Sequence, residues 1–253
     1  MRKLTNRIGL NSYKKEKNIN RETLYCFSPP IMLATFIIEM LLAVYVYIKS
    51  IKAKSDVGIV LVLVFLAVFQ LSEYQICEGT HTLFWTRIGL FAITFLPVLG
   101  LYLISKLNRE SKMLKVGFLI SIIFAIVFVF APNAVTGATC GGNYIMFDID
   151  AGVGTMYGMY YFGFLILGIW EAAKGVKSEE NKAKIKSALR WFIIGYLSFI
   201  LPLTVVYIFI PATRVAVASI MCGFAVIFAF ILAFKIAPIY HECIKAEPKK
   251  KVE

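Results

Sequence analysis

Charged residues are scarce in this chain of 253 residues. Only 17% of it is Asp, Glu, Lys or Arg, whereas 59% is hydrophobic, and the mean hydropathy is +0.76. An average soluble domain has about 25% charged residues. A soluble fold could not bury this much apolar surface, so the composition excludes an ordinary soluble domain and predicts a membrane protein.

Histidine and the common catalytic motifs are also rare or absent. The chain has two histidines, His81 and His241, and no G-x-S-x-G elbow, phosphate-binding loop or H-E-x-x-H motif. The sequence therefore gives no positive sign of an enzyme. It also indicates no cofactor and no nucleic-acid partner.

Seven apolar runs are long enough to cross a bilayer, which takes about 20 mostly apolar residues. The runs are continuous, whereas the strands of a membrane barrel alternate between apolar and polar residues. The predicted fold is therefore all-α, a seven-helix transmembrane bundle over residues 29–236. The expected helices are residues 30–48, 57–76, 83–104, 116–131, 151–170, 189–210 and 215–234.

Basic residues alternate between successive loops, and cytoplasmic loops are the ones that retain positive charge. The loops after the first, third and fifth runs hold three, four and six basic residues, whereas the loop from Pro132 to Asp150 holds none. This pattern predicts an N-terminus outside and a C-terminus in the cytoplasm. Anionic lipid is the expected partner of the cytoplasmic loops.

The two ends of the chain are expected to lie outside the bundle. Residues 1–28 carry seven basic and two acidic residues, and we expect a flexible segment there. They lack the apolar core of a cleavable signal peptide, and their charge opposes an outside location. Residues 237–253 are expected to form a short basic cytoplasmic tail. With seven predicted spans, the protein is expected to be a multi-pass membrane protein. The expected location is a prokaryotic cell membrane.

Three polar residues of the second run fall on one helical face. Gln70, Glu73 and Cys77 are spaced i, i+3 and i+7. Glu39 stands about nine residues into the first run, or roughly 14 Å deep. An ionised side chain at such a depth costs at least about 3 kcal/mol unless it is paired, protonated or hydrated. Glu39 should therefore face the bundle, either as a proton carrier or as a polar contact to a backbone carbonyl or Gln70.

Arg87 opens the third run and is the expected partner of Glu73 on the neighbouring helix. Thr94 follows Arg87 by seven residues and so shares its face. The predicted polar intramembrane site comprises Glu39, Gln70, Glu73, Arg87 and Thr94. Alternatively, the Glu73–Arg87 ion pair has a purely structural role and only holds two helices together.

Three of the five cysteines, Cys26, Cys77 and Cys140, are expected outside, where oxidising conditions favour disulfides. A Cys77–Cys140 bond, a Cys26–Cys77 bond and three unrelated thiols all stay open. A weaker hypothesis is a zinc or copper site that includes Cys77 and His81. The chain has no C-x-x-C or H-x-x-x-H pair to support it.

Two short motifs carry a resemblance. The sequence "CFSP" at Cys26–Pro29, followed by "FQLSE" at Phe69–Glu73, resembles an uncharacterised group of small polytopic membrane proteins with Cys-Phe-Ser before span one and Gln-x-x-Glu in span two. The resemblance covers roughly the first third of the chain. It implies a seven-span fold and draws attention to Cys26, Gln70 and Glu73, but it carries no known activity.

Three classes of function fit these features. A small proton-coupled transporter or channel would use Glu39 and Glu73 as titrating groups facing outward. A membrane sensor or assembly subunit would bind a ligand or a partner protein at the outer face. A thiol redox or metal-handling protein would use the outer cysteines. We favour them in that order.

Overall fold

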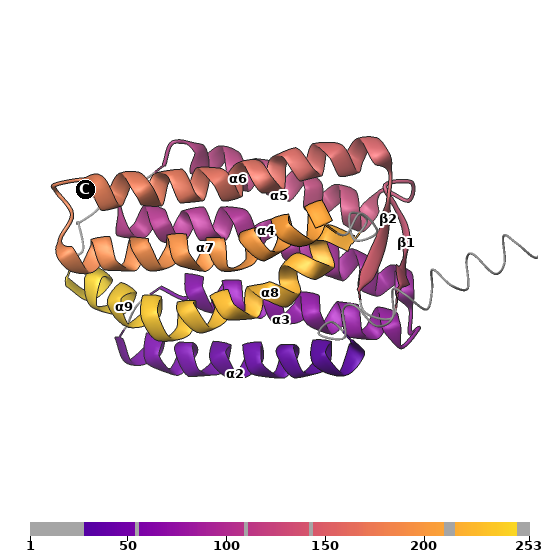
Figure 1. The fold of residues 1–253 in the computed structure, drawn as a ribbon, viewed down its shortest axis with the longest axis horizontal. Helices are drawn as coiled ribbons and strands as arrows, with labels where there is room; N and C mark the ends of the chain where they lie inside the picture. Colours follow the sequence, from indigo (N-terminus) through magenta and orange to yellow (C-terminus); the bar gives the residue numbers. More distant parts are fainter. Residues whose placement is uncertain (1–27, 54–55, 109–110, 142–143, 210–215, 247–253) are drawn as a thin grey trace, which may run out of the picture.

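The computed structural model describes residues 28–53, 56–108, 111–141, 144–209 and 216–246, and within them seven helical segments are long and apolar enough to cross a membrane (Figure 1). The predicted seven-helix fold class is confirmed, and the chain is an integral, multi-pass membrane protein. The segments are α2 (Pro29–Ala53), α3 (Gly58–Cys77), α4 (Thr82–Leu107), α5 (Met113–Phe130), α6 (Ala151–Lys177), α7 (Ala183–Phe209), and a last one formed by α8 (Val217–Ile231), the π-helical turn η3 (Leu232–Ile236) and α9 (Ala237–Ala246).

The helices lie side by side along the long axis of the molecule (Figure 1). Large apolar side chains such as Leu41, Phe130 and Phe209 are exposed on their outer surfaces. In water such a surface would drive aggregation, whereas in a bilayer it contacts acyl chains. The exposed apolar surface is therefore the lipid-facing side of the bundle.

The loop between α5 and α6 contains a β-hairpin, which the hydropathy pattern does not predict. Strand β1 (Val135–Cys140) pairs antiparallel with β2 (Ile145–Ile149). The hairpin lies at one end of the bundle and α9 lies at the other (Figure 1). We call these ends the hairpin end and the α9 end. The charge pattern predicts that the hairpin end faces outside.

The last transmembrane segment was expected to end at residue 234, but it continues through α9, past the expected end of the bundle at residue 236. The side chain of Tyr240 is fully buried, and the His241 ring lies 3.4 Å from the Ser50 hydroxyl of α2. Packing against α2 and its neighbours therefore extends the helix into the first part of the predicted tail. Residues 1–27, most of the predicted flexible N-terminal segment, lie outside the described part of the chain.

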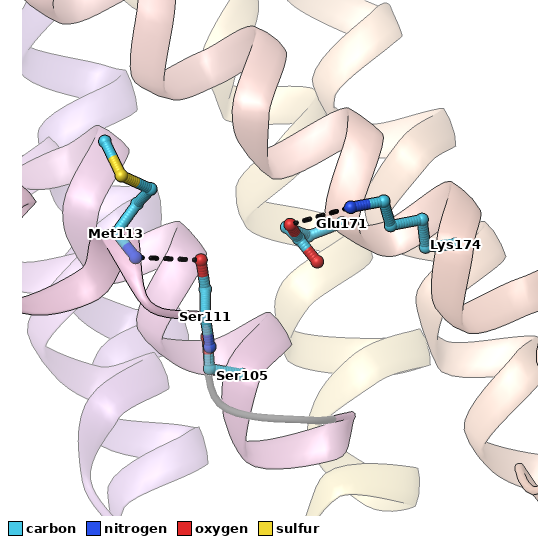
Figure 2. Close-up of polar contacts among 5 residues, drawn as sticks. All are labelled: Ser105, Ser111, Met113, Glu171 and Lys174. Carbon is cyan, nitrogen blue, oxygen red and sulfur yellow. Dashed lines mark hydrogen bonds and ion pairs between the residues drawn. The ribbon is translucent and has the colours of Figure 1, made fainter.

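Polar contacts also occur near the helix termini. The Ser111 hydroxyl accepts a hydrogen bond from the backbone N–H of Met113 at the start of α5, at 3.4 Å (Figure 2). On α6, Lys174 pairs with Glu171 across 3.4 Å (Figure 2). The Lys174 side chain is 58% exposed and that of Glu171 is 21% exposed, and solvent-accessible pairs of this kind contribute little to stability. Glu171 is therefore a suitable control position for substitutions of the buried glutamates Glu39 and Glu73.

Close packing of α7 against α8 depends on Gly195. A Cβ atom added at this position would lie 2.3 Å from Cδ2 of Phe228, whose ring is buried. We expect Gly195→Ala to lower the free energy of unfolding by about 1–3 kcal/mol because the ring must move. Unfolding in detergent measures the effect. Gly163→Ala is the control, since a Cβ there meets nothing within 4 Å, and equal stability of the two variants would contradict the packing.

Candidate functional site

Glu39 lies on the buried face of α2. It shares that face with Met32, Leu42, Val46 and Ser50, whose spacings place them on one side of the helix. The exposed fraction of Glu39 is 0%. Neither of its carboxyl oxygens has a hydrogen-bond partner among the described residues. The structure therefore places Glu39 inside the bundle, away from lipid.

Gln70 and Glu73 occupy the buried face of α3, one turn apart. Their exposed fractions are 2% and 1%. The Gln70 Nε2 and the Glu73 Oε1 also lack hydrogen-bond partners within the described ranges. Buried side-chain polar atoms are usually hydrogen-bonded, so α2 and α3 together hold an unusual concentration of unpaired polar atoms.

Glu39 and the two α3 residues lie close in depth. Met32 and Ile76 belong to one buried cluster near the hairpin end, and α2 and α3 run antiparallel. Glu39 follows Met32 by seven residues, and Gln70 precedes Ile76 by six, so Glu39 and Gln70 lie at similar depths. Glu73 lies one turn nearer to the hairpin end. The two carboxyl groups are near enough to interact electrostatically.

Helix α8 completes the cluster with Ser219 and Cys222. The Ser219 side chain hydrogen-bonds to Glu73. Cys222 is buried one turn further along α8, within electrostatic range of both Glu73 and Glu39. We define Glu39, Gln70, Glu73 and Ser219 as the carboxyl pair site.

The β-hairpin covers the carboxyl pair site at the hairpin end. The backbone N–H of Ile145 donates to the Ser219 hydroxyl at 3.2 Å, and the Ile145 side chain is fully buried. The Phe147 ring lies 5.9 Å from that of Phe69, the residue before Gln70. One element thus contacts both helices that hold Glu73 and Ser219. In this conformation the site is closed at the hairpin end.

A disulfide between Cys77 and Cys140 fixes the hairpin to the end of α3. Of the pairings that the sequence left open, this is the one present in the structure; Cys26 lies outside the described residues. Because Cys77 is bonded to Cys140, its thiolate is not available as a metal ligand. His81 is exposed, and the described residues contain no group of three or more His, Cys, Asp or Glu side chains that could hold a metal. The weak metal-site hypothesis is therefore not supported.

The expected ion pair between Glu73 and Arg87 does not form. Arg87 instead donates from Nη1 to the backbone oxygen of Val129 on α5, at 2.7 Å. Helix geometry explains the difference. Gly89 is the residue of α4 that packs on Ser72 of α3, and a residue two positions away points about 160° from it. Arg87 is therefore directed toward α5 and away from Glu73.

Thr94 follows Arg87 to the same side of α4, as its spacing predicted. Its hydroxyl donates to the Leu90 backbone oxygen at 2.6 Å and lies 3.4 Å from the hydroxyl of Tyr157. Tyr160 donates to the Thr94 backbone oxygen at 2.7 Å. Thr94 thus contacts α6, and both its hydroxyl and its backbone oxygen have hydrogen-bond partners. The five predicted site residues divide into Glu39, Gln70 and Glu73 on one side, and Arg87 and Thr94 on another.

Sequence reasoning missed Ser219, which belongs to the carboxyl pair site, and Cys222, which lies beside it. They are spaced i, i+3 in the last apolar run, which is the signal that placed Gln70 and Glu73 on one face. Serine is common in membrane helices, where its hydroxyl can bond to the helix backbone or pack between helices, and a single cysteine in an apolar run resembles other small apolar residues. The spacing of Ser219 and Cys222 alone therefore did not distinguish them from residues that only pack between helices.

Comparison of the chain with protein-family models, with curated proteins and with solved structures finds no match. The carboxyl pair site and its surroundings are therefore the basis on which a function can be inferred.

Proposed function

We propose that this protein is a small proton-coupled transporter or channel, and that its carboxyl pair site binds the proton or a small cation. One observation carries the proposal: Glu39 is fully buried at membrane depth, and neither carboxyl oxygen has a partner within the described residues. Ionisable residues inside membrane proteins are costly and usually mark ion pathways or proton relays.

A purely structural role for Glu39 is less consistent with its surroundings. A glutamate that joins helices does so through a hydrogen bond across the interface. Glu39 makes no such bond within the described residues, although Gln70 lies at a similar depth and its own Nε2 is unpaired. An unpaired buried carboxyl stabilises nothing, because it has lost its hydration without gaining a partner. Its retention is better explained by ligand binding.

The pairing of two carboxyl groups favours a cationic ligand. Two negative charges that are buried near each other repel and are poorly solvated. A proton or a small cation bound between Glu39 and Glu73 removes both costs. Gln70 and Ser219 supply further oxygen atoms at the same depth. The closed hairpin then corresponds to a state in which a bound ion cannot exchange with the hairpin side.

Ion flux in liposomes tests the proposal. The purified protein is reconstituted with a pH-sensitive dye inside the vesicles, and a membrane potential is imposed. We expect wild-type protein to admit protons, and Glu39→Gln and Glu73→Gln to reduce the flux to that of empty vesicles. Glutamine keeps the size of the side chain but cannot carry the proton.

The matched control is Glu171→Gln. This variant makes the same chemical change at a partly exposed glutamate on α6, which lies outside the carboxyl pair site and pairs with Lys174 (Figure 2), and it should retain the wild-type flux. Absence of flux in the wild type across proton, sodium and potassium gradients would reject a transporter or channel. Unchanged flux in both buried-site variants would reject the site. A membrane sensor, in contrast, would be recognised by a stable copurifying protein.

A further inference from the structure

A cavity of about 30 Å³ lies in the middle of the bundle, between α3, α4, α6, α7 and α8. Its walls are mainly apolar, from residues such as Leu66, Leu96 and Phe199. Three polar side chains also line it: Tyr161, Tyr196 and Cys222. A cavity must have about 10–15 Å³ to hold one water molecule. The cavity therefore has room for about two.

The Tyr196 hydroxyl has no hydrogen-bond partner in the described part of the chain, and the residue is only 2% exposed. Two glycines make room for it. A Cβ added at Gly100 of α4 would overlap the hydroxyl oxygen, and one at Gly168 of α6 would lie 3.3 Å from it. A buried tyrosine hydroxyl normally has a partner. In this position the group that can supply the missing bond is a water in the cavity.

The three polar groups suit ordered water. A buried water makes about three hydrogen bonds, and the hydroxyls of Tyr161 and Tyr196 and the thiol of Cys222 are three groups with donor or acceptor capacity. Purely apolar cavities stay dry, whereas a cavity with polar groups and enough room can hold water. The cavity thus has three polar groups in a wall that is otherwise apolar.

The cavity adjoins the carboxyl pair site through Cys222. This residue lies one turn from Ser219 on α8 and within electrostatic range of Glu39 and Glu73. Ordered water beside Cys222 would therefore extend the chain of polar groups from the carboxyls toward the centre of the bundle.

A second polar group lies on the α9 side of the cavity. Leu103 lines the cavity, and its side chain also reaches the surroundings of Gly58, beside Asp56 and Tyr102. The Tyr102 hydroxyl donates to Asp56. The buried hydroxyl of Tyr240, which has no partner among the residues described, lies within electrostatic range of both. Asp56 is only half-buried, so this group reaches the surface at the α9 end.

We propose that the cavity is a water-binding site that carries protons between the carboxyl pair site and the Asp56–Tyr102–Tyr240 group. This inference rests on the proposed function and adds a route to the α9 end, while the hairpin closes the other end. Each hydroxyl or water along the route accepts a proton on one side and releases another on the opposite side. No net bond is made or broken.

Tyr196→Phe tests the route because it removes one hydroxyl and keeps the ring. We expect proton flux to fall about tenfold, the change that a barrier higher by about 1.4 kcal/mol produces. We also expect the infrared S–H stretch of Cys222, assigned by its loss in Cys222→Ala, to shift in Tyr196→Phe. The control is Tyr207→Phe, on the lipid-exposed side of the same helix (46% exposed). It should change neither the proton flux nor the S–H stretch of Cys222.

The infrared carboxylic-acid band of Glu39 and Glu73 separates the two proposals. If that band responds to pH and the wild type conducts, but Tyr196→Phe alters neither the flux nor the S–H stretch, the water route is overturned and the carboxyl pair site stands. If the wild type shows no flux and the band is independent of pH, the proposed function itself fails. Unfolding in detergent checks that Tyr196→Phe is folded, and Asp56→Asn provides a second variant, also expected to slow the flux.

Discussion

Replacing Cys77 and Cys140 together by serine is expected to lower the free energy of unfolding by about 2–4 kcal/mol. The disulfide joins residues 63 positions apart, with α4, α5 and β1 between them. Without it the unfolded chain gains conformational freedom, and the folded hairpin keeps only its noncovalent contacts. Unfolding in detergent, with and without reductant, measures the loss. The double variant should be insensitive to reductant, and equal stability of the reduced and oxidised wild type would contradict the prediction.

Removal of the Cys77–Cys140 disulfide should also open the carboxyl pair site. Without the disulfide, the hairpin remains attached through the Ile145–Ser219 hydrogen bond and the contact of Phe147 with Phe69. Both can break without unfolding the bundle. A hydrophobic carbodiimide should therefore modify Glu73 faster in the reduced protein, as mass spectrometry of the labelled peptide would show. Labelling of Glu171 on α6 is the internal control, and a rate for Glu73 that reduction leaves unchanged would exclude the hairpin as a cover.

The apolar runs predicted the fold well because the bilayer imposes a simple rule on them. A segment in hydrocarbon must satisfy its backbone internally, and a helix of sufficient length is the solution. The same energetic rule directed Glu39 and Glu73 inward, as the structure has them. The direction of insertion depends on the charge of loops relative to a membrane, and it stays a prediction.

The partners of the buried groups were harder to predict. Arg87 and Glu73 stand on adjacent helices, but the rotation of α4 about its own axis decides whether they meet. That rotation is set by the contact of Gly89 with Ser72, and sequence spacing within one helix gives no information on it. The hairpin escaped prediction for a similar reason. Its strands are short, and their stability comes from Cys77, Ser219 and Phe69 on distant helices.

The central cavity depends on the same kind of long-range contact. Gly100, Gly168 and Tyr196 lie on three different helices, and the hydroxyl occupies the space that both glycines leave. Each of these residues is ordinary within its own apolar run. Only their meeting in space creates a buried hydroxyl that has no partner among the described residues, so the proposed water route is a consequence of packing between helices.

Replacing Glu39 by leucine is expected to raise the free energy of unfolding, by about 1–3 kcal/mol, while it abolishes ion flux. Leaving a buried polar group without a partner costs about that much, and neither oxygen of Glu39 has one within the described residues. Leucine fills a similar volume without any polar atom. Stability gained together with activity lost is typical of residues kept for function. Unfolding in detergent, compared with the liposome assay, measures both.

Glu73→Leu is the informative comparison, because Glu73 differs from Glu39 in having a partner. Its loss would remove the hydrogen bond with Ser219 and weaken the position that this hydroxyl holds under Ile145. We therefore expect Glu73→Leu to be no more stable than the wild type, in contrast to Glu39→Leu. A lower stability of Glu39→Leu would mean that this carboxyl joins helices through a bond formed in the membrane. It would then be a structural contact, and the case for ion binding would pass to Glu73 alone.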